Sequence, residues 1–159
     1  MTTATLSKQT VEAKWNTAKL QEEFGRVMAM NMMTTMGILS KHGEELTKEF
    51  QAAMMHNKVE HYKQLGVKTP MDLVKHMAEF EANMFGSKIE IWGDEKTAHM
   101  QYNACGMWNA IKKTGKMDAQ QEEKMGAQFQ TCTQNLAKEF GITAEIKFEG
   151  DSCLMTFTK

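Results

Sequence analysis

The chain has 159 residues, enough for one folded domain with a sizeable core, and a formal net charge of -1. This near-neutral charge argues against a nucleic-acid-binding protein, which needs a basic surface to neutralise phosphates. Three widely spaced cysteines, and no apolar block before Lys19, lead us to expect a cytoplasmic protein with reduced thiols and no signal peptide.

The N-terminal part is expected to be helical. Its apolar residues recur every four or five positions: Val11, Trp15, Leu20 and Phe24. Gly25 is expected to interrupt this helix, after which residues 27–39 form a methionine-rich run that is apolar on most sides and too short to cross a bilayer. We interpret residues 1–40 as a helical N-terminal extension. Its run 27–39 is expected to contact a second copy of the chain, in a homo-oligomer, or another protein partner.

Two further helices are expected before any strand. The first begins at Glu44, after a break at Lys41-His42-Gly43, and runs to about Leu65, where Gly66 closes it. The second begins at Thr69-Pro70-Met71-Asp72, in which threonine caps the helix, proline takes the first helical position and aspartate the third. Its predicted inward stripe, which ends before Gly86, consists of Leu73, Met77, Phe80 and Met84.

From Lys88 the spacing of apolar residues changes from a helical period to strict alternation. This predicts a hairpin of residues 88–92 and 97–105, an undecided stretch 106–116, and two final strands around a turn at 149–152. Between them a helix is expected from Asp118, with an apolar stripe of Met125, Phe129, Cys132, Leu136 and Phe140. Residues 41–159 are therefore expected to form a single α+β domain, a small antiparallel sheet of ββαββ order covered by helices.

The cysteines fall on three separate pieces of this last third. Cys132 and Cys153 lie on apolar faces, so both are expected to point at the core, where an inert buried thiol is the ordinary role. Cys105 falls on the polar face of its strand, in line with His99, and that face is either solvent-exposed or lines a pocket. His99 is excluded as the proton carrier for Cys105, because six strand residues place the two roughly 20 Å apart.

Three pieces of the sequence together resemble the L-2-amino-thiazoline-4-carboxylic acid hydrolase-like family over about residues 40–159. They are the strand ending in Cys105, the helix with a central Cys132, and the terminal Gly150-Asp151-Ser152-Cys153 followed by an alternating strand. The Gly-x-x-Cys ending is also similar to the vinyl-4-reductase small-molecule-binding domains. The resemblance implies a hydrolase of a cyclic thiazoline-type C–N or C–S bond. Cys105 would act as nucleophile or metal ligand and Asp151 would orient a partner.

Two other functions stay open. The chain could be a non-enzymatic domain that binds a small molecule or a metal between sheet and helices. It could also be an accessory subunit of a larger complex, assembled through the methionine-rich helix. A metal site would need Cys105, Cys132 and Cys153 to meet where the sheet touches its covering helix, and zinc or iron would be the expected metal.

Overall fold

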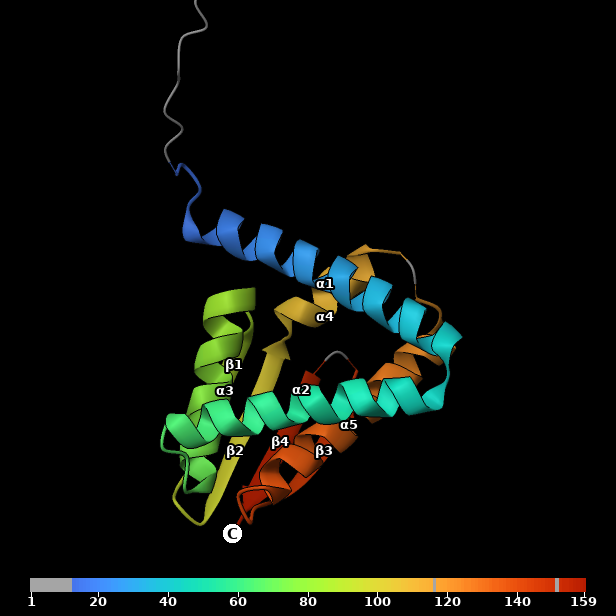
Figure 1. Ribbon diagram of the computed structural model, residues 1–159. Coiled ribbons are helices and arrows are strands. Elements are labelled where there is room, and N and C mark those ends of the chain that lie inside the picture. Colours follow the sequence, from blue (N-terminus) through green and yellow to red (C-terminus); the bar gives the residue numbers. More distant parts are fainter. Residues whose placement is uncertain (1–12, 116, 151) are drawn as a thin grey trace, which may run out of the picture.

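Figure 1 shows the computed structural model, which describes residues 13–115, 117–150 and 152–159. Its elements in chain order are α1 (Thr17–His42), α2 (Glu44–Gln64), α3 (Pro70–Phe85), β1 (Lys88–Gly93), β2 (Thr97–Ala104), α4 (Gly106–Lys113), α5 (Ala119–Lys138), β3 (Thr143–Glu149) and β4 (Ser152–Thr158). Helices come first and a small antiparallel sheet follows, which confirms the predicted α+β class. Within the described ranges, no helix is long and apolar enough to span a membrane.

The four strands form one antiparallel sheet in the order β1-β2-β4-β3. Its core face is built from buried residues of the two central strands that oppose one another in register: Ala98 and Phe157, Met100 and Met155, Tyr102 and Cys153. Helices α3 and α5 pack against the sheet, whereas the alternate polar residues of β2 are half-buried or exposed. The face that carries His99 is therefore the solvent side.

Helix starts and ends follow the local sequence closely. The Thr69 hydroxyl accepts a hydrogen bond from the backbone N–H of Asp72 at 3.2 Å, and the Asp72 carboxylate accepts one from the N–H of Thr69 at 3.0 Å. These hydrogen bonds hold the pKa of Asp72 below its usual value. Asp118 caps α5 in the same reciprocal way, and Gly86 ends α3 in the left-handed conformation with φ 65°. The predicted capping signals are confirmed.

Helix α1 differs from the prediction, because it passes through Gly25 without a break. Gly25 lies where α1 meets α4, and a Cβ atom on it would be 3.4 Å from the Cβ of Ala110. The glycine therefore permits close packing of two helices. The undecided stretch after the hairpin contains α4 itself.

The buried stripes of two helices are rotated from their predicted positions. In α3, Phe80 is 51% exposed while Val74 is fully buried. In α5, Phe129 is exposed, and the buried residues are Thr133, Leu136 and Ala137. Two of these buried side chains, Thr133 and Ala137, are small, whereas the prediction followed the largest apolar residues.

The two sheet phenylalanines provide a matched test of this core. We expect Phe157→Ala to lower the free energy of unfolding by about 3–5 kcal/mol, because Phe157 is fully buried. Phe148→Ala, at a residue 48% exposed on the neighbouring strand, should cost roughly 1 kcal/mol or less. Urea unfolding followed by circular dichroism measures both. Equal losses would contradict the assigned core face.

Candidate functional site

Cys105 occupies the N-cap position of α4 and is not part of a strand. Strand β2 ends at Ala104, and the Cys105 side chain caps α4 by accepting a hydrogen bond from the backbone N–H of Trp108 at 3.4 Å. The side chain is half-buried and packs against the main hydrophobic core. The prediction that it lies on the polar strand face with His99 is therefore wrong, because the chain leaves the strand one residue earlier.

A hydroxyl and a carboxyl group lie beside this thiol. The buried Ser87 hydroxyl donates a hydrogen bond to Oε2 of Glu81 at 3.1 Å and accepts one from the backbone N–H of Gly106 at 2.9 Å. Ser87 also lies close enough to Cys105 to lower the pKa of its thiol slightly. A hydroxyl has one donor and two acceptor sites, so the hydrogen bonds with Glu81 and Gly106 leave one acceptor site on the Ser87 oxygen. The end of α3, the turn after it and the start of α4 thus bring Glu81, Ser87 and Cys105 into one row.

Burial controls the protonation of both ends of this row. It raises the pKa of the Glu81 carboxyl, against an opposing hydrogen bond from Ser87 and the charge of Lys58. Burial also raises the pKa of the Cys105 thiol, partly offset by the backbone N–H of Trp108. The thiol is therefore protonated at neutral pH, and the Glu81 carboxyl is linked to its neighbourhood by the hydrogen bond from Ser87.

The core side of the row holds a second cysteine and a tyrosine. Cys153 of β4 pairs with Tyr102 of β2, and both are buried, as predicted for Cys153. Burial raises the pKa of Cys153 to about 11, and the charge of Cys105 adds to this shift. Burial also raises the pKa of Tyr102. The charges of Glu81, Cys105 and Cys153 raise it further, each by less than burial does. Cys105 and Cys153 therefore belong to one polar cluster inside an apolar core.

Cys132 is not part of this cluster. It is exposed on α5, and the prediction that it faces the sheet is wrong because the helix turns Thr133 and Leu136 inward instead. In the part of the chain that the structure describes, no group of three or more His, Cys, Asp or Glu residues is arranged to hold a metal. Cys105, Cys132 and Cys153 therefore do not form the predicted metal site, and the donor set does not fit zinc or iron. Asp151 lies outside the described residues.

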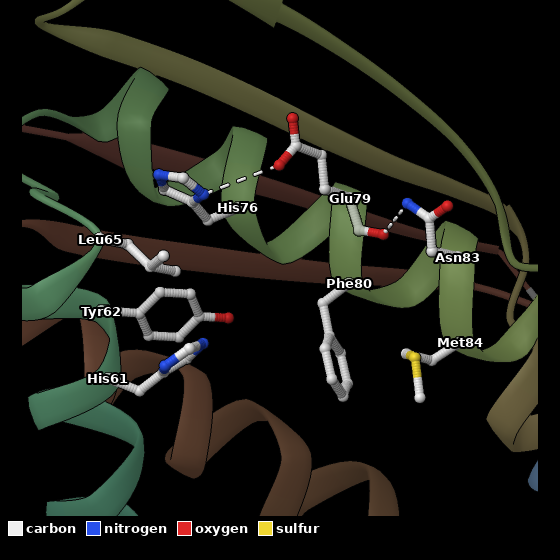
Figure 2. A pocket seen from close by; sticks show the side chains of 8 residues that line it. All are labelled: His61, Tyr62, Leu65, His76, Glu79, Phe80, Asn83 and Met84. Carbon is white, nitrogen blue, oxygen red and sulfur yellow. Dashed lines mark hydrogen bonds and ion pairs between the residues drawn. The ribbon is translucent and has the colours of Figure 1, made fainter.

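Figure 2 shows a pocket of about 380 Å³ between α2 and α3. It is lined by His61, Tyr62, Leu65, His76, Glu79, Phe80, Asn83 and Met84. The Tyr62 hydroxyl points into the space between the two helices (Figure 2), and burial raises its pKa to about 12, with the charge of Glu81 adding to the shift. Tyr62 therefore lines the pocket, and its pKa also depends on the charge of Glu81.

Glu81 and Ser87 were missed by the sequence analysis. One signal was present, because the buried positions Val74 and Met77 lead, at helical spacing, to Glu81. A charged residue on the core face of a helix is unusual enough to mark a site. No comparable signal marks Ser87, whose role depends on the close approach of α3 and α4.

Comparison with known proteins adds no assignment, since no family model matches the chain and no curated protein is significantly similar to it. The resemblance to the thiazoline hydrolase-like family stays an expectation. Function is therefore inferred from the side chains around Cys105.

The three thiols should differ in reactivity with a neutral alkylating reagent. We expect iodoacetamide at pH 8 to modify the exposed Cys132 first, the half-buried Cys105 more slowly, and the buried Cys153 last. The pKa of Cys153, about 11, also keeps its thiolate scarce. Peptide mass spectrometry over time gives the order, and fast modification of Cys153 in the folded protein would contradict the cluster.

Glu81 should make stability pH-dependent in a defined direction. Its pKa is raised in the folded state, so its protonated form favours folding, and this stability is lost as pH rises from below 4.5 through the raised folded pKa. We expect Glu81→Gln to raise the thermal midpoint at pH 7.5 relative to wild type, with a smaller difference near pH 4. Glu79→Gln, at a carboxylate 71% exposed on the same helix, is the control and should change little. Equal shifts at both pH values would contradict the assignment.

Proposed function

We propose that this chain is a cysteine-dependent hydrolase of small cyclic substrates of the thiazoline type. Cys105 is the nucleophile and Glu81 the general base. The proposal is carried by one observation, the row of thiol, hydroxyl and carboxyl formed by Cys105, Ser87 and Glu81 at the start of α4. A nucleophile next to a base that a third group orients is the arrangement that covalent catalysis requires.

The chemistry follows from the positions of the protons. The thiol proton of Cys105 passes to Ser87 as the Ser87 proton passes to Glu81. The sulfur electron pair forms a bond to the carbon of the ring C=N group, and the π electrons of that group move to the nitrogen. The backbone N–H of Trp108, at the positive end of α4, stabilises the developing thiolate. Glu81 then returns the proton to the ring nitrogen or sulfur as its bond to that carbon breaks. Water subsequently cleaves the enzyme–substrate bond and restores the thiol.

The raised pKa of Glu81 supports its role as base. A carboxylate of ordinary pKa is too weak to take a thiol proton effectively, and burial brings Glu81 closer to the working pH. This supplies the proton acceptor that the strand residue His99 cannot be. The ring of His99 instead stacks on Trp92 with centroids 5.1 Å apart, and its Nδ1 lies 3.1 Å from the Thr156 hydroxyl.

The pocket of Figure 2 supports the alternative, a non-enzymatic small-molecule-binding domain. Its volume of about 380 Å³ is typical of small-ligand sites, and the rings of His61, Tyr62 and Phe80 offer flat apolar surface. Cys105, Ser87 and Glu81 are not among its lining residues, so the pocket does not bear on the hydrolase. A reducing, cytoplasmic compartment is part of the proposal, because it would keep all three cysteines as the free thiols described.

Turnover and trapping test this function. With L-2-amino-thiazoline-4-carboxylic acid and close cyclic analogues, we expect wild-type turnover and a covalent adduct on Cys105 detectable by mass spectrometry. Cys105→Ser should lose the adduct and at least about 10²-fold in kcat, and Glu81→Gln should lower kcat about 10²–10⁴-fold. Cys132→Ser, at the exposed thiol, is the control and should keep full activity.

Two results would contradict the proposed hydrolase function. One is activity that survives Cys105→Ser. The other is binding of these substrates, measured by calorimetry, without turnover in the wild type, which would instead support the binding domain.

A further inference from the structure

Helix α1 has two apolar faces, and among the residues that the structure describes the larger contact is made by one of them. Its inner face holds the buried residues Gly25, Ala29 and Leu39 together with the half-buried Met32, Met33 and Met36. On this side α4, α2 and α3 contact α1. Most of the methionines expected to meet a partner therefore pack against their own chain.

The outer face carries a stripe at alternating spacings of four and three residues, in which the exposed members are Leu20, Val27, Asn31, Thr34 and Ile38. Phe24 has the remaining position of this spacing, but it is half-buried and its ring lies 5.4 Å from that of Phe85 on α3. Leu20, Val27 and Ile38 are 57%, 44% and 52% exposed, and Asn31 and Thr34 are exposed as well. Alternation of four and three is the spacing with which one helix meets another in a two-stranded coiled coil. Such a stripe left in solvent indicates a missing helix.

Asn31 in the middle of this stripe indicates which helix is missing. In a parallel pair of identical helices each seam residue faces its own copy, so two asparagine side chains meet and hydrogen-bond to each other. Facing any apolar helix, the same asparagine would lose water without gaining a partner. The stripe is thus complementary to itself.

The charges of α1 agree with this reading. Lys19 and Arg26 both pair with Glu23 inside the helix, at 2.7 and 2.8 Å, and need no external partner. Beside the seam lie Met28 and Met30, 37% and 46% exposed, which add apolar surface on its two flanks. In a parallel pair Glu23 faces the flank of Met28, so no like charges oppose each other there.

We propose that two copies of this chain form a parallel homodimer through α1, with Asn31 facing Asn31 of the partner subunit. The seam from Leu20 to Ile38 is about 27 Å long at the helical rise. This is short for a stable interface, so we expect a concentration-dependent dimer with a Kd on the order of micromolar. The inference is independent of the proposed hydrolase function.

Analytical ultracentrifugation from about 1 to 200 μM tests the assembly. Wild type should shift from monomer to dimer across this range, whereas Val27→Glu and Ile38→Glu should weaken the dimer at least about 10-fold, because each buries a charge in the seam. Leu46→Glu is the matched control, since Leu46 on α2 is 43% exposed and Val27 is 44% exposed. Circular dichroism confirms that each variant stays folded. A wild type that is monomeric at every concentration, or a dimer that both seam variants retain, would overturn the proposal.

A disulfide trap tests the register. In a Cys132→Ser background, which removes the exposed native thiol, Asn31→Cys should form a cross-linked dimer with oxidised glutathione on a non-reducing gel. Arg26→Cys is the control, because this exposed position lies off the seam on the same helix. Equal cross-linking at both positions, or none at position 31, would overturn the parallel register.

Discussion

The candidate site depends on one junction, the contact between the end of α3 and the start of α4. A Cβ on Gly106 would collide with the backbone carbonyl of Phe85, so only glycine allows the two helix ends to approach this closely. The approach places the N–H of Gly106 on the Ser87 hydroxyl, which in turn donates to Glu81. Without this junction the thiol of Cys105 would have a helix terminus beside it but no carboxylate.

Burial makes the junction both costly and useful. Removing Glu81 and Cys105 from water raises both pKa values, which disfavours the charged forms and lowers folded-state stability at neutral pH. The same desolvation makes the carboxylate a stronger base and, once formed, the thiolate a stronger nucleophile. The proposed reactive site would use this arrangement, because perturbed acids and bases gather at such sites.

Local signals predicted much of the fold. Thr69, Pro70 and Asp72 marked the start of α3 because capping depends only on neighbouring residues, and alternation located the strands because one sheet face is buried. The site was less predictable. Alternation predicts a strand position for Cys105 because it continues one residue beyond the last residue of β2. The large apolar residues near Cys132 predict that it faces the core, although the small residues Thr133 and Ala137 are the buried ones. Which face of a helix is buried depends on the helices and strands that pack against it, and local sequence patterns do not predict where those elements lie.

The most direct test of the central claim is a titration of the Glu81 carboxyl by carbon-13 NMR in wild type and Ser87→Ala. The account predicts a wild-type pKa above the ordinary value of 4.5, because burial dominates. It also predicts a further rise in Ser87→Ala, because the hydrogen bond from Ser87 stabilises the charged form and lowers the pKa. A Glu81 that titrates at its ordinary pKa in both proteins would contradict the proposed coupling of carboxyl, hydroxyl and thiol.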